Sequence, residues 1–253
     1  MLTGAFADNE TGTNDIDEGF TQGIVIREAG FVVKNLVSDD ERIQAHRLRH
    51  RVYCEELGWV PRSETLLEID AYDRHTVFIG VLDQHQTLLA SCRLHLPGTA
   101  FMIEREFSSL VGAWHKIRKH NDTAEVSRSC VAQEARRVVV RRGSGIYRLS
   151  TLVYKGVYHW CSMNGIRYVY IVVEDKLYRM LRAMGFQSHL VGAPVTMPDG
   201  CVAMAAVVDW KEFVSGNTVK RPDFAKWFTL DESGRFEEPR RQPEFCSQPE
   251  ASP

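Results

Sequence analysis

The chain has 253 residues, enough for one large domain or two small ones. Apolar residues make up 44% of it and charged residues 25%, an ordinary balance for a soluble globular protein, and no stretch is apolar enough for a membrane-spanning helix. The 31 basic and 33 acidic residues leave a net charge of −2, which excludes a surface built throughout for nucleic acid. We therefore expect no transmembrane segment, no nucleic-acid partner and only local basic sites.

The cysteines indicate neither a metal site nor a disulfide framework. Because no two of the six share the short spacing of a zinc site, we predict buried thiols and no metal centre. The first basic residue is Arg27, and no apolar run precedes it, so we expect neither a secretory signal nor an Arg-rich transit peptide. We expect a reduced, cytoplasmic protein.

Both ends of the chain have compositions typical of disorder. Residues 1–23 hold five acidic residues and no basic one, and residues 229–253 hold four prolines among charges. We predict a disordered acidic N-terminal tail over 1–23, one folded domain over 24–228, and a disordered Pro-rich C-terminal tail over 229–253.

The first predicted elements are a strand over residues 31–37 and a helix that begins at Ser38. Ser38 and Glu41 have the spacing of a capping box, in which each side chain accepts a hydrogen bond from the other's backbone amide. Apolar residues then recur at helical spacing, and Gly58 provides the natural end.

Three strands are predicted next. Residues 76–82 and 88–96 are rich in β-forming residues and are joined through the polar segment Asp83-Gln-His-Gln, so we expect an antiparallel hairpin. A third strand is predicted over residues 124–132.

A helix is predicted over residues 147–163, after a basic loop that contains Gly143 and Gly145. The β-branched run at 168–173 predicts a further strand. This strand, helix, strand order is a βαβ unit, whose strands should be parallel neighbours.

The folded part ends with a short helix over residues 175–184, capped by Gly185, and a strand over 201–208. Together the elements predict an α/β fold, a single domain with a mixed central sheet flanked by helices on both faces.

One candidate binding site joins the first helix to an acidic loop. Arg49 and Tyr53 are four residues apart and so share a helix face. A pocket of this kind could hold a cationic substrate. The alternative is an ion pair between Arg49 and an aspartate that only orders the loop. Metal binding by Asp70 and Asp73 is not favoured, because the EF-hand pattern of ligands is missing. The residues are an arginine, two aromatics and three carboxylates: Arg49, Tyr53, Trp59, Glu68, Asp70 and Asp73.

A second candidate lies on the third predicted strand. Alternation places Glu125 and Ser127 on one side and Val126 and Arg128 on the other. A carboxylate in a central strand is costly unless it is paired or used. Glu125 could take a proton from an amine nucleophile if burial raised its pKa toward neutrality. A buried ion pair with Arg93 or another base is the alternative.

The third candidate is basic. Between Ala135 and Val173 there is no acidic residue, and Gly143 and Gly145 would present backbone amides to a phosphate at the start of the predicted helix. A solvated basic loop and a nucleic-acid patch are the alternatives. Seven bases give this stretch a local charge of +7: Arg136, Arg137, Arg141, Arg142, Arg148, Lys155 and Arg167.

In this order the residues resemble the acyl-homoserine-lactone autoinducer synthases of the GNAT-like acyltransferase superfamily. The resemblance covers about residues 31–210 and is carried by segments 47–59, 67–73, 91–94, 101–107 and 125–128. The family's characteristic residues fall on Arg49, Tyr53, Trp59, Asp70, Asp73, Arg93, Phe107, Glu125 and Arg128.

Two positions depart from the family pattern. Tyr53 stands where the synthases usually carry Phe, and Ser129 follows Arg128 where an aromatic residue is usual. The C-terminal half is at least as similar to the long-chain N-acyl amino acid synthases and exosortase-associated acyltransferases, which differ in the amine that they acylate.

The resemblance implies a GNAT-like N-acyltransferase with no tightly bound cofactor. It would move a fatty acyl group from a thioester on acyl carrier protein, or on coenzyme A, to the amino group of an amino-acid-derived acceptor. Glu125 would be the base, acting with Arg128 and with backbone amides near Ser129 that stabilise the oxyanion. A splayed central strand pair would admit the thioester, and Phe101, Met102 and Phe107 would line the acyl tunnel.

The resemblance also implies two binding partners. The acidic carrier and its pantetheine phosphate would meet the basic stretch: Arg136, Arg137, Arg141, Arg142, Gly143, Gly145 and Arg148. If S-adenosylmethionine is the acceptor, its cationic and aromatic parts would contact Arg49, Trp59, Asp70 and Asp73. If it is an amino acid, Arg49 or Arg93 would bind its carboxylate. We favour S-adenosylmethionine because Trp59 and residues 101–107 fit the lactone synthases better.

Two further functions are less consistent with the sequence. An acetyl-coenzyme A-dependent GNAT enzyme would need a small residue where Tyr147 ends the nearest pyrophosphate-loop match. A non-catalytic module that binds acyl carrier protein would retain carrier binding without thioester turnover.

Overall fold

The computed structural model describes residues 22–142 and 145–230. The two predicted tails lie almost wholly outside these ranges, and so does Gly143.

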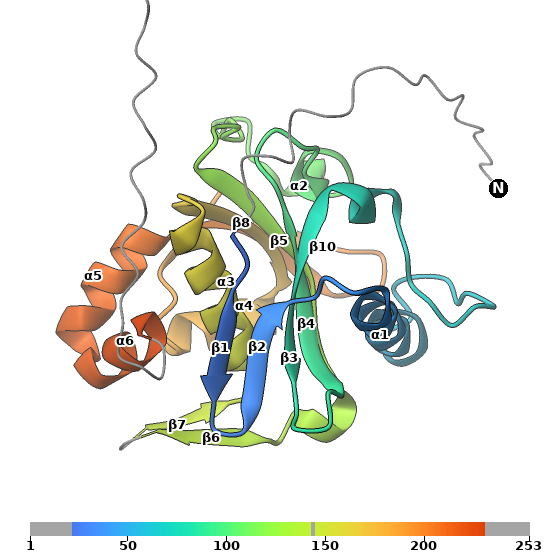
Figure 1. The fold of residues 1–253 in the computed structure, drawn as a ribbon. Helices are drawn as coiled ribbons and strands as arrows, with labels where there is room; N and C mark the ends of the chain where they lie inside the picture. Colours follow the sequence, from blue (N-terminus) through green and yellow to red (C-terminus); the bar gives the residue numbers. More distant parts are fainter. Residues whose placement is uncertain (1–21, 143–144, 231–253) are drawn as a thin grey trace, which may run out of the picture.

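A nine-stranded mixed sheet forms the centre of the fold (Figure 1). Its order is β1-β2-β3-β4-β5-β8-β11-β10, with β9 also paired to β11. The β5–β8 contact is parallel, as predicted from the βαβ unit, and the other recorded pairs in the sheet are antiparallel. The strands are β1 (Val25–Glu28), β2 (Phe31–Asn35), β3 (Thr76–Leu82), β4 (Leu88–His95), β5 (Thr123–Val131), β8 (Tyr168–Glu174), β9 (Ser188–Leu190), β10 (Val195–Thr196) and β11 (Val202–Asp209).

Helices cover both faces of the sheet, which confirms the predicted α/β class. Figure 1 shows α1 on one side and α3, α5 and α6 on the other. The α-helices are α1 (Asp39–Arg49), α2 (Met102–Arg105), α3 (Ser150–Met163), α4 (Asp175–Ala183), α5 (Trp210–Lys220) and α6 (Pro222–Thr229). None of the helices within 22–142 and 145–230 is both long and apolar enough to cross a membrane.

The first helix begins and ends where the sequence predicts. The Ser38 hydroxyl accepts from the Glu41 amide at 3.3 Å, and the Glu41 carboxylate accepts from the Ser38 amide at 3.2 Å. After Arg49 the helix continues as a π-helical segment, η2 (His50–Glu56), and it ends before Gly58, whose φ is +66°.

The strands β5 and β8 separate partway along their length. Thr123–Val126 pairs with Tyr168–Ile171, and no ladder pair joins the later described residues of the two strands. Against β4, the register shifts because Ser91 pairs with Cys130 whereas Arg93 pairs with Ser127. One extra residue of β5 therefore forms a bulge at Arg128, whose φ is +52°.

A hairpin replaces the predicted glycine loop, so that prediction was wrong. The strands β6 (Val139–Arg142) and β7 (Gly145–Arg148) form a separate two-stranded sheet, and α3 begins only at Ser150. The cause is the β-forming residues in 139–142 and 145–148, which pair with each other instead of entering the helix.

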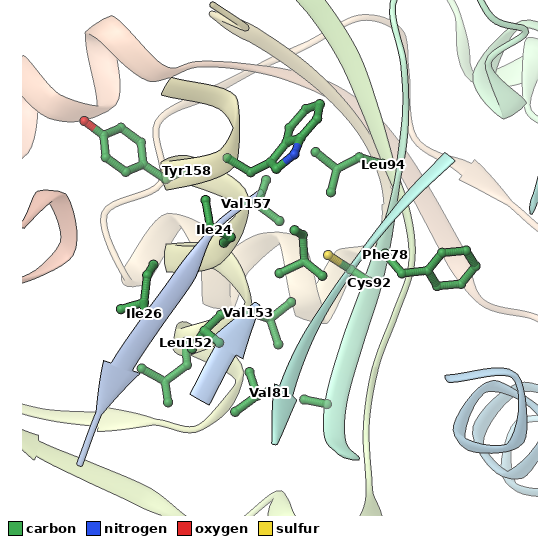
Figure 2. Close-up of a cluster of buried hydrophobic side chains, with 14 of the residues drawn as sticks. Ile24, Ile26, Phe78, Val81, Cys92, Leu94, Leu152, Val153, Val157 and Tyr158 are labelled. Atoms are coloured by element: carbon green, nitrogen blue, oxygen red, sulfur yellow. The ribbon is translucent and has the colours of Figure 1, made fainter. Parts of the chain in front are cut away.

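The main core lies between α3 and the strands β1 to β4. Figure 2 shows Leu152, Val153 and Val157 of α3 against Ile24, Ile26 and Val81. Each of these side chains is at least 96% buried, worth roughly 1.5–3 kcal/mol apiece. Gly156 permits this approach, since an added Cβ would lie 2.6 Å from Val33.

Candidate active site

A buried cluster of six charges lies beside the first helix. The Arg49 Nη1 and Arg93 Nη1 atoms share one oxygen of Asp73, at 2.7 and 2.6 Å. Arg93 Nη1 also donates to Asp70 at 2.5 Å. Glu68 binds Arg49 on one side and Arg128 on the other, the latter at 3.0 Å.

These contacts hold the two aspartates, Asp70 and Asp73, ionised. Burial alone would raise the pKa of Asp70, but the hydrogen bond and charge of Arg93 outweigh it and leave that pKa below its usual value. Burial is likewise outweighed at Asp73, where Arg49 lowers the pKa. The ion pair that the sequence offered as the alternative role of Arg49 is therefore present.

The acidic loop is fixed at both its ends. Asp70 and Asp73 form a capping box around the short helix η3 (Ala71–His75), with the Asp70 amide donating to Asp73 at 2.9 Å. His46 Nδ1 lies 3.0 Å from the Glu68 carbonyl, and the Glu68 amide donates to the His46 carbonyl at 3.2 Å. Glu68 is therefore a member of the cluster, although it is not among the residues that the family resemblance carries over. The sequence signal for it is its position close to Asp70 and Asp73 in the acidic loop.

Two predicted acceptor residues lie at the rim of the cluster. Tyr53 donates a hydrogen bond from its hydroxyl to the Ser129 carbonyl at 2.8 Å, and the Arg128 guanidinium lies 5.5 Å from its ring centre. Trp59 is 46% exposed, with its ring centre 6.1 Å from that of Tyr53. An aromatic pair therefore borders Arg128 where the cluster meets solvent.

The predicted orientation of Arg128 was wrong. Strict alternation would place the Arg128 side chain on the opposite side of the strand from Ser127. Arg93 hydrogen-bonds both Ser127 and Asp70, and Arg128 Nη2 contacts the same Asp70 carboxylate at 3.2 Å. The bulge at Arg128 breaks the alternation of β5 and brings the two arginines together.

Glu125 lies on the neighbouring part of β5 and is 1% exposed. Its carboxylate accepts from the amides of Met102 at 2.5 Å and Ile103 at 2.9 Å, at the start of α2. Burial raises its pKa to about 7, against the opposing effect of these two hydrogen bonds. The alternative prediction of a buried ion pair with Arg93 or another base was wrong: among the described residues, the partners of the two carboxylate oxygens are backbone amides.

Two polar residues near Glu125 were not predicted. The Ser127 hydroxyl lies 2.8 Å from His95 Nε2 and 3.0 Å from Arg93 Nε. Burial and the charge of Arg93 lower the pKa of His95 to about 3, so this imidazole is neutral. The feature that could have identified both residues is the pairing of β4 with β5, which sets His95 opposite Glu125 and Arg93 opposite Ser127.

The predicted acyl-tunnel residues divide into two groups. Phe101 and Phe107 belong to a second apolar cluster, together with Tyr170 and Ala205 from β8 and β11. Met102 lies outside that cluster, and its sulfur is 3.2 Å from Arg93 Nη2.

The basic stretch is partly neutralised within the protein. Four of its bases have acidic partners: Arg136 with Glu56, Arg142 and Lys155 with Glu28, and Arg167 with Asp209. Arg137, Arg141 and Arg148 are exposed and make no ion pair with any residue in the described ranges. Gly145 lies in β7, five residues before α3, so it does not present its amide at a helix start. Across the described ranges, no group of three metal-ligating side chains converges.

Comparison with known proteins places this chain in a family. The model of the autoinducer synthases matches residues 34–213. An acyl-homoserine-lactone synthase of Aeromonas hydrophila is 28% identical over 149 residues, which are 59% of this chain and 70% of that protein.

Solved structures share the fold. A CoA-dependent acyl-homoserine lactone synthase, BjaI, solved with SAM and isopentyl-CoA, has 24% identity and a TM-score of 0.61 over 72% of this chain and 82% of its own. FeeM, an N-acyl amino acid synthase from uncultured soil microbes, has 16% identity and a TM-score of 0.56 over 74% and 93%. The same fold thus occurs in proteins named for two different products.

Proposed function

Because the chain belongs to the autoinducer synthase family, which are acyltransferases, we propose that it makes acyl-homoserine lactones from an acyl thioester and S-adenosylmethionine. The acceptor's amine nitrogen attacks the thioester carbonyl, the carrier thiol leaves, and the amine loses a proton. The acceptor's carboxylate then displaces the sulfonium group, which closes the lactone and releases 5′-methylthioadenosine.

The observation that carries this proposal is the buried Glu125 carboxylate beside the point where β5 and β8 separate. A base works best when its pKa lies near the working pH, and that of Glu125 is raised to about 7. Its hydrogen bonds from Met102 and Ile103 fix its position. Glu125 accepts the proton of the attacking amine, directly or through a water molecule.

The acceptor contacts the outer members of the charged cluster. The Asp70 side chain is 21% exposed, against 10% for Asp73 and 3% for Glu68, and Arg128 is 16% exposed, against 1% for Arg49. Asp70 therefore meets the cationic part of S-adenosylmethionine, and Arg128 its carboxylate. The exposed Trp59 ring covers the aromatic part, while the buried charges hold Asp70 and Arg128 in place.

The oxyanion of the tetrahedral intermediate is stabilised by backbone amides of β5 near Ser129. The bulge at Arg128 supports this role, because β5 leaves its neighbour β8 just before it. The acyl chain extends toward the apolar cluster that contains Phe101 and Phe107.

Mass spectrometry of extracts from a bacterial host that expresses the chain tests the proposal. We expect acyl-homoserine lactones with the wild type and with Glu134→Gln, a surface control whose side chain is 63% exposed, and none with Glu125→Gln. Long-chain N-acyl amino acids without lactones would contradict the proposed acceptor. Neither product from the wild type would contradict the proposed activity.

A further inference from the structure

We infer that His95 is a positioning residue of the acceptor site. It accepts a hydrogen bond from the Ser127 hydroxyl, which leaves the Ser127 oxygen to accept a hydrogen bond from the amino group of S-adenosylmethionine. This role rests on the proposed function, since it assigns a partner to the amine of the acceptor proposed above.

Four polar side chains lie together on one face of the β4–β5 pair. Strand pairing sets His95 opposite Glu125 and Arg93 opposite Ser127. His95 and Glu125 are each 1% exposed and Arg93 is fully buried, whereas Ser127 is partly exposed. Ser127 is therefore the member of this group that a bound molecule can touch.

The hydrogen-bond partners of His95 fix which of its nitrogens carries the hydrogen. Because the pKa of His95 is lowered to about 3 by burial and by the charge of Arg93, the ring is neutral and has a single N–H group. The ring also hydrogen-bonds the backbone of Ala100, and this contact raises the pKa, as donation to a carbonyl does. Nε2 lies 2.8 Å from the Ser127 hydroxyl. With the ring hydrogen donated to Ala100, Nε2 accepts the hydroxyl hydrogen of Ser127.

The Ser127 oxygen is left as an acceptor. A serine hydroxyl has one hydrogen and two lone pairs. The hydrogen is donated to His95, and one lone pair accepts from Arg93 Nε at 3.0 Å. Among the described residues the hydroxyl has no third partner, so its second lone pair is available. An amino group supplies the N–H that this lone pair needs, whereas a carboxylate brings only lone pairs.

The position of Ser127 also aligns the amino group with the proposed base. Ser127 and Glu125 lie on the same side of β5, two residues apart, a spacing of about 7 Å along the strand. A nitrogen atom with hydrogen bonds of about 3 Å in each direction bridges such a distance. An amine held by Ser127 therefore directs another of its hydrogens toward the Glu125 carboxylate.

A serine hydroxyl that donates to a histidine nitrogen is also the arrangement of a nucleophilic serine. Two features argue against that role here. With a pKa of about 3, the His95 ring is too weak a base to remove the hydroxyl proton. The hydrogen bond from Arg93 also occupies a lone pair of the oxygen that would attack.

Calorimetric titration without an acyl donor tests this role with two ligands. S-adenosylmethionine carries the amino group, and 5′-methylthioadenosine shares its nucleoside part but lacks the amine. We expect His95→Leu and Ser127→Ala to weaken binding of S-adenosylmethionine about tenfold and to leave binding of methylthioadenosine within about twofold. The His95→Gln variant should bind both ligands within about threefold of the wild type, because its amide oxygen can accept the Ser127 hydrogen.

Two further variants separate positioning from packing. If His95 acts through Ser127, the double variant Ser127→Ala/His95→Leu should bind S-adenosylmethionine as Ser127→Ala alone does. Ser91→Ala is the matched control, since Ser91 is a buried serine of β4 that contacts Cys130 instead. It should leave the affinity for both ligands unchanged.

Three results would overturn the positioning role of His95. The first is an unchanged affinity of Ser127→Ala for S-adenosylmethionine, and the second is an equal loss for both ligands in His95→Leu and Ser127→Ala, or additive losses in the double variant. The third is a covalent acyl adduct on the wild type after incubation with an acyl thioester, absent from Ser127→Ala. The expected binding changes without lactone formation by the wild type would support this role and contradict the proposed activity. A wild type that does not bind S-adenosylmethionine would contradict both.

Discussion

The Tyr53 hydroxyl donates a hydrogen bond to the main-chain carbonyl of Ser129, 2.8 Å away. These are the two positions that depart from the family pattern, and the structure brings them into direct contact. Ser129 directly follows Arg128, which adopts φ +52° and lies over the Tyr53 ring. Tyr53 therefore fixes the bulge through its hydroxyl and the guanidinium through its ring.

Removal of the Tyr53 hydroxyl should weaken acceptor binding more than catalysis. In Tyr53→Phe the Ser129 carbonyl loses its partner and Arg128 is held less firmly, at a cost of about 1 kcal/mol or roughly fivefold in KM for S-adenosylmethionine. Initial rates at varied acceptor concentration check this result. Tyr72→Phe removes a hydrogen bond to the exposed Glu106 carboxylate and should change KM less. Equal changes in KM for the two variants would mean that Tyr53 does not position Arg128.

Glu125 should make the fold less stable as the pH rises. Its pKa is raised from 4.5 to about 7, so the folded state binds the proton more tightly than the unfolded chain does. The stability that this group contributes is complete below about pH 4.5 and is lost by about pH 7, a change of roughly 3 kcal/mol.

Urea unfolding at about pH 5 and about pH 8 checks this prediction. Between these values the free energy of unfolding of Glu125→Gln should fall by less than that of the wild type, since glutamine does not titrate. The same pH dependence in the two proteins would mean that the carboxyl of Glu125 titrates near its ordinary value.

Asp73 should matter far more for stability than a surface acid does. Asp73→Asn leaves the buried Arg49 and Arg93 with one carboxylate fewer, and we expect a loss of about 3–5 kcal/mol in the free energy of unfolding. Asp175→Asn breaks a pair with Arg179, which is 78% exposed, and should cost less than about 1 kcal/mol. Similar losses in the two variants would contradict the burial of the charged cluster.

Removing one partner of the Glu28–Lys155 ion pair should lower the free energy of unfolding more than replacing both partners with uncharged residues. Both side chains are 1% exposed, and their charged atoms are 2.8 Å apart. Lys155→Met alone leaves the buried Glu28 carboxylate with the longer 3.6 Å contact to the half-exposed Arg142, with an expected loss of about 3–5 kcal/mol. Glu28→Gln/Lys155→Met should recover more than half of that loss in thermal or urea unfolding. A double variant as unstable as the sum of the two single ones would contradict this account.

Elements with a local signal were predictable from the sequence. The Ser38 capping box, the β3–β4 hairpin and the apolar face of α3 follow from short-range patterns, and each is present. The parallel β5–β8 contact followed from the crossover rule.

Other elements were missed for identifiable reasons. β1 turns into β2 at Ala29 and Gly30, both of positive φ, and this two-residue hairpin signal was overlooked. The sequence predicts a loop where the β6–β7 hairpin lies, because the glycines and arginines there also fit a phosphate site. The helices α5 and α6 form through packing of Phe213 and Phe228 on the core, which requires tertiary contacts.

The site was predictable in its members and not in its geometry. Arg49, Asp70, Asp73, Arg93 and Arg128 do converge, because the motif residues lie on elements that the sheet brings together. The orientation of Arg128 could not follow from alternation, since a bulge depends on the register between two strands. The amide partners of Glu125 come from α2, which no local pattern predicted to lie there.

Quantification of all three products from one reaction tests the central claim most directly. The purified chain is given S-adenosylmethionine and an acyl thioester, and acyl-homoserine lactone, 5′-methylthioadenosine and free carrier thiol are measured together. We expect equal amounts of the three from the wild type and at least a hundredfold slower formation of all three by Glu125→Gln. Thiol release without methylthioadenosine or lactone would contradict the assignment as a lactone synthase, and full activity of Glu125→Gln would remove Glu125 from the reaction.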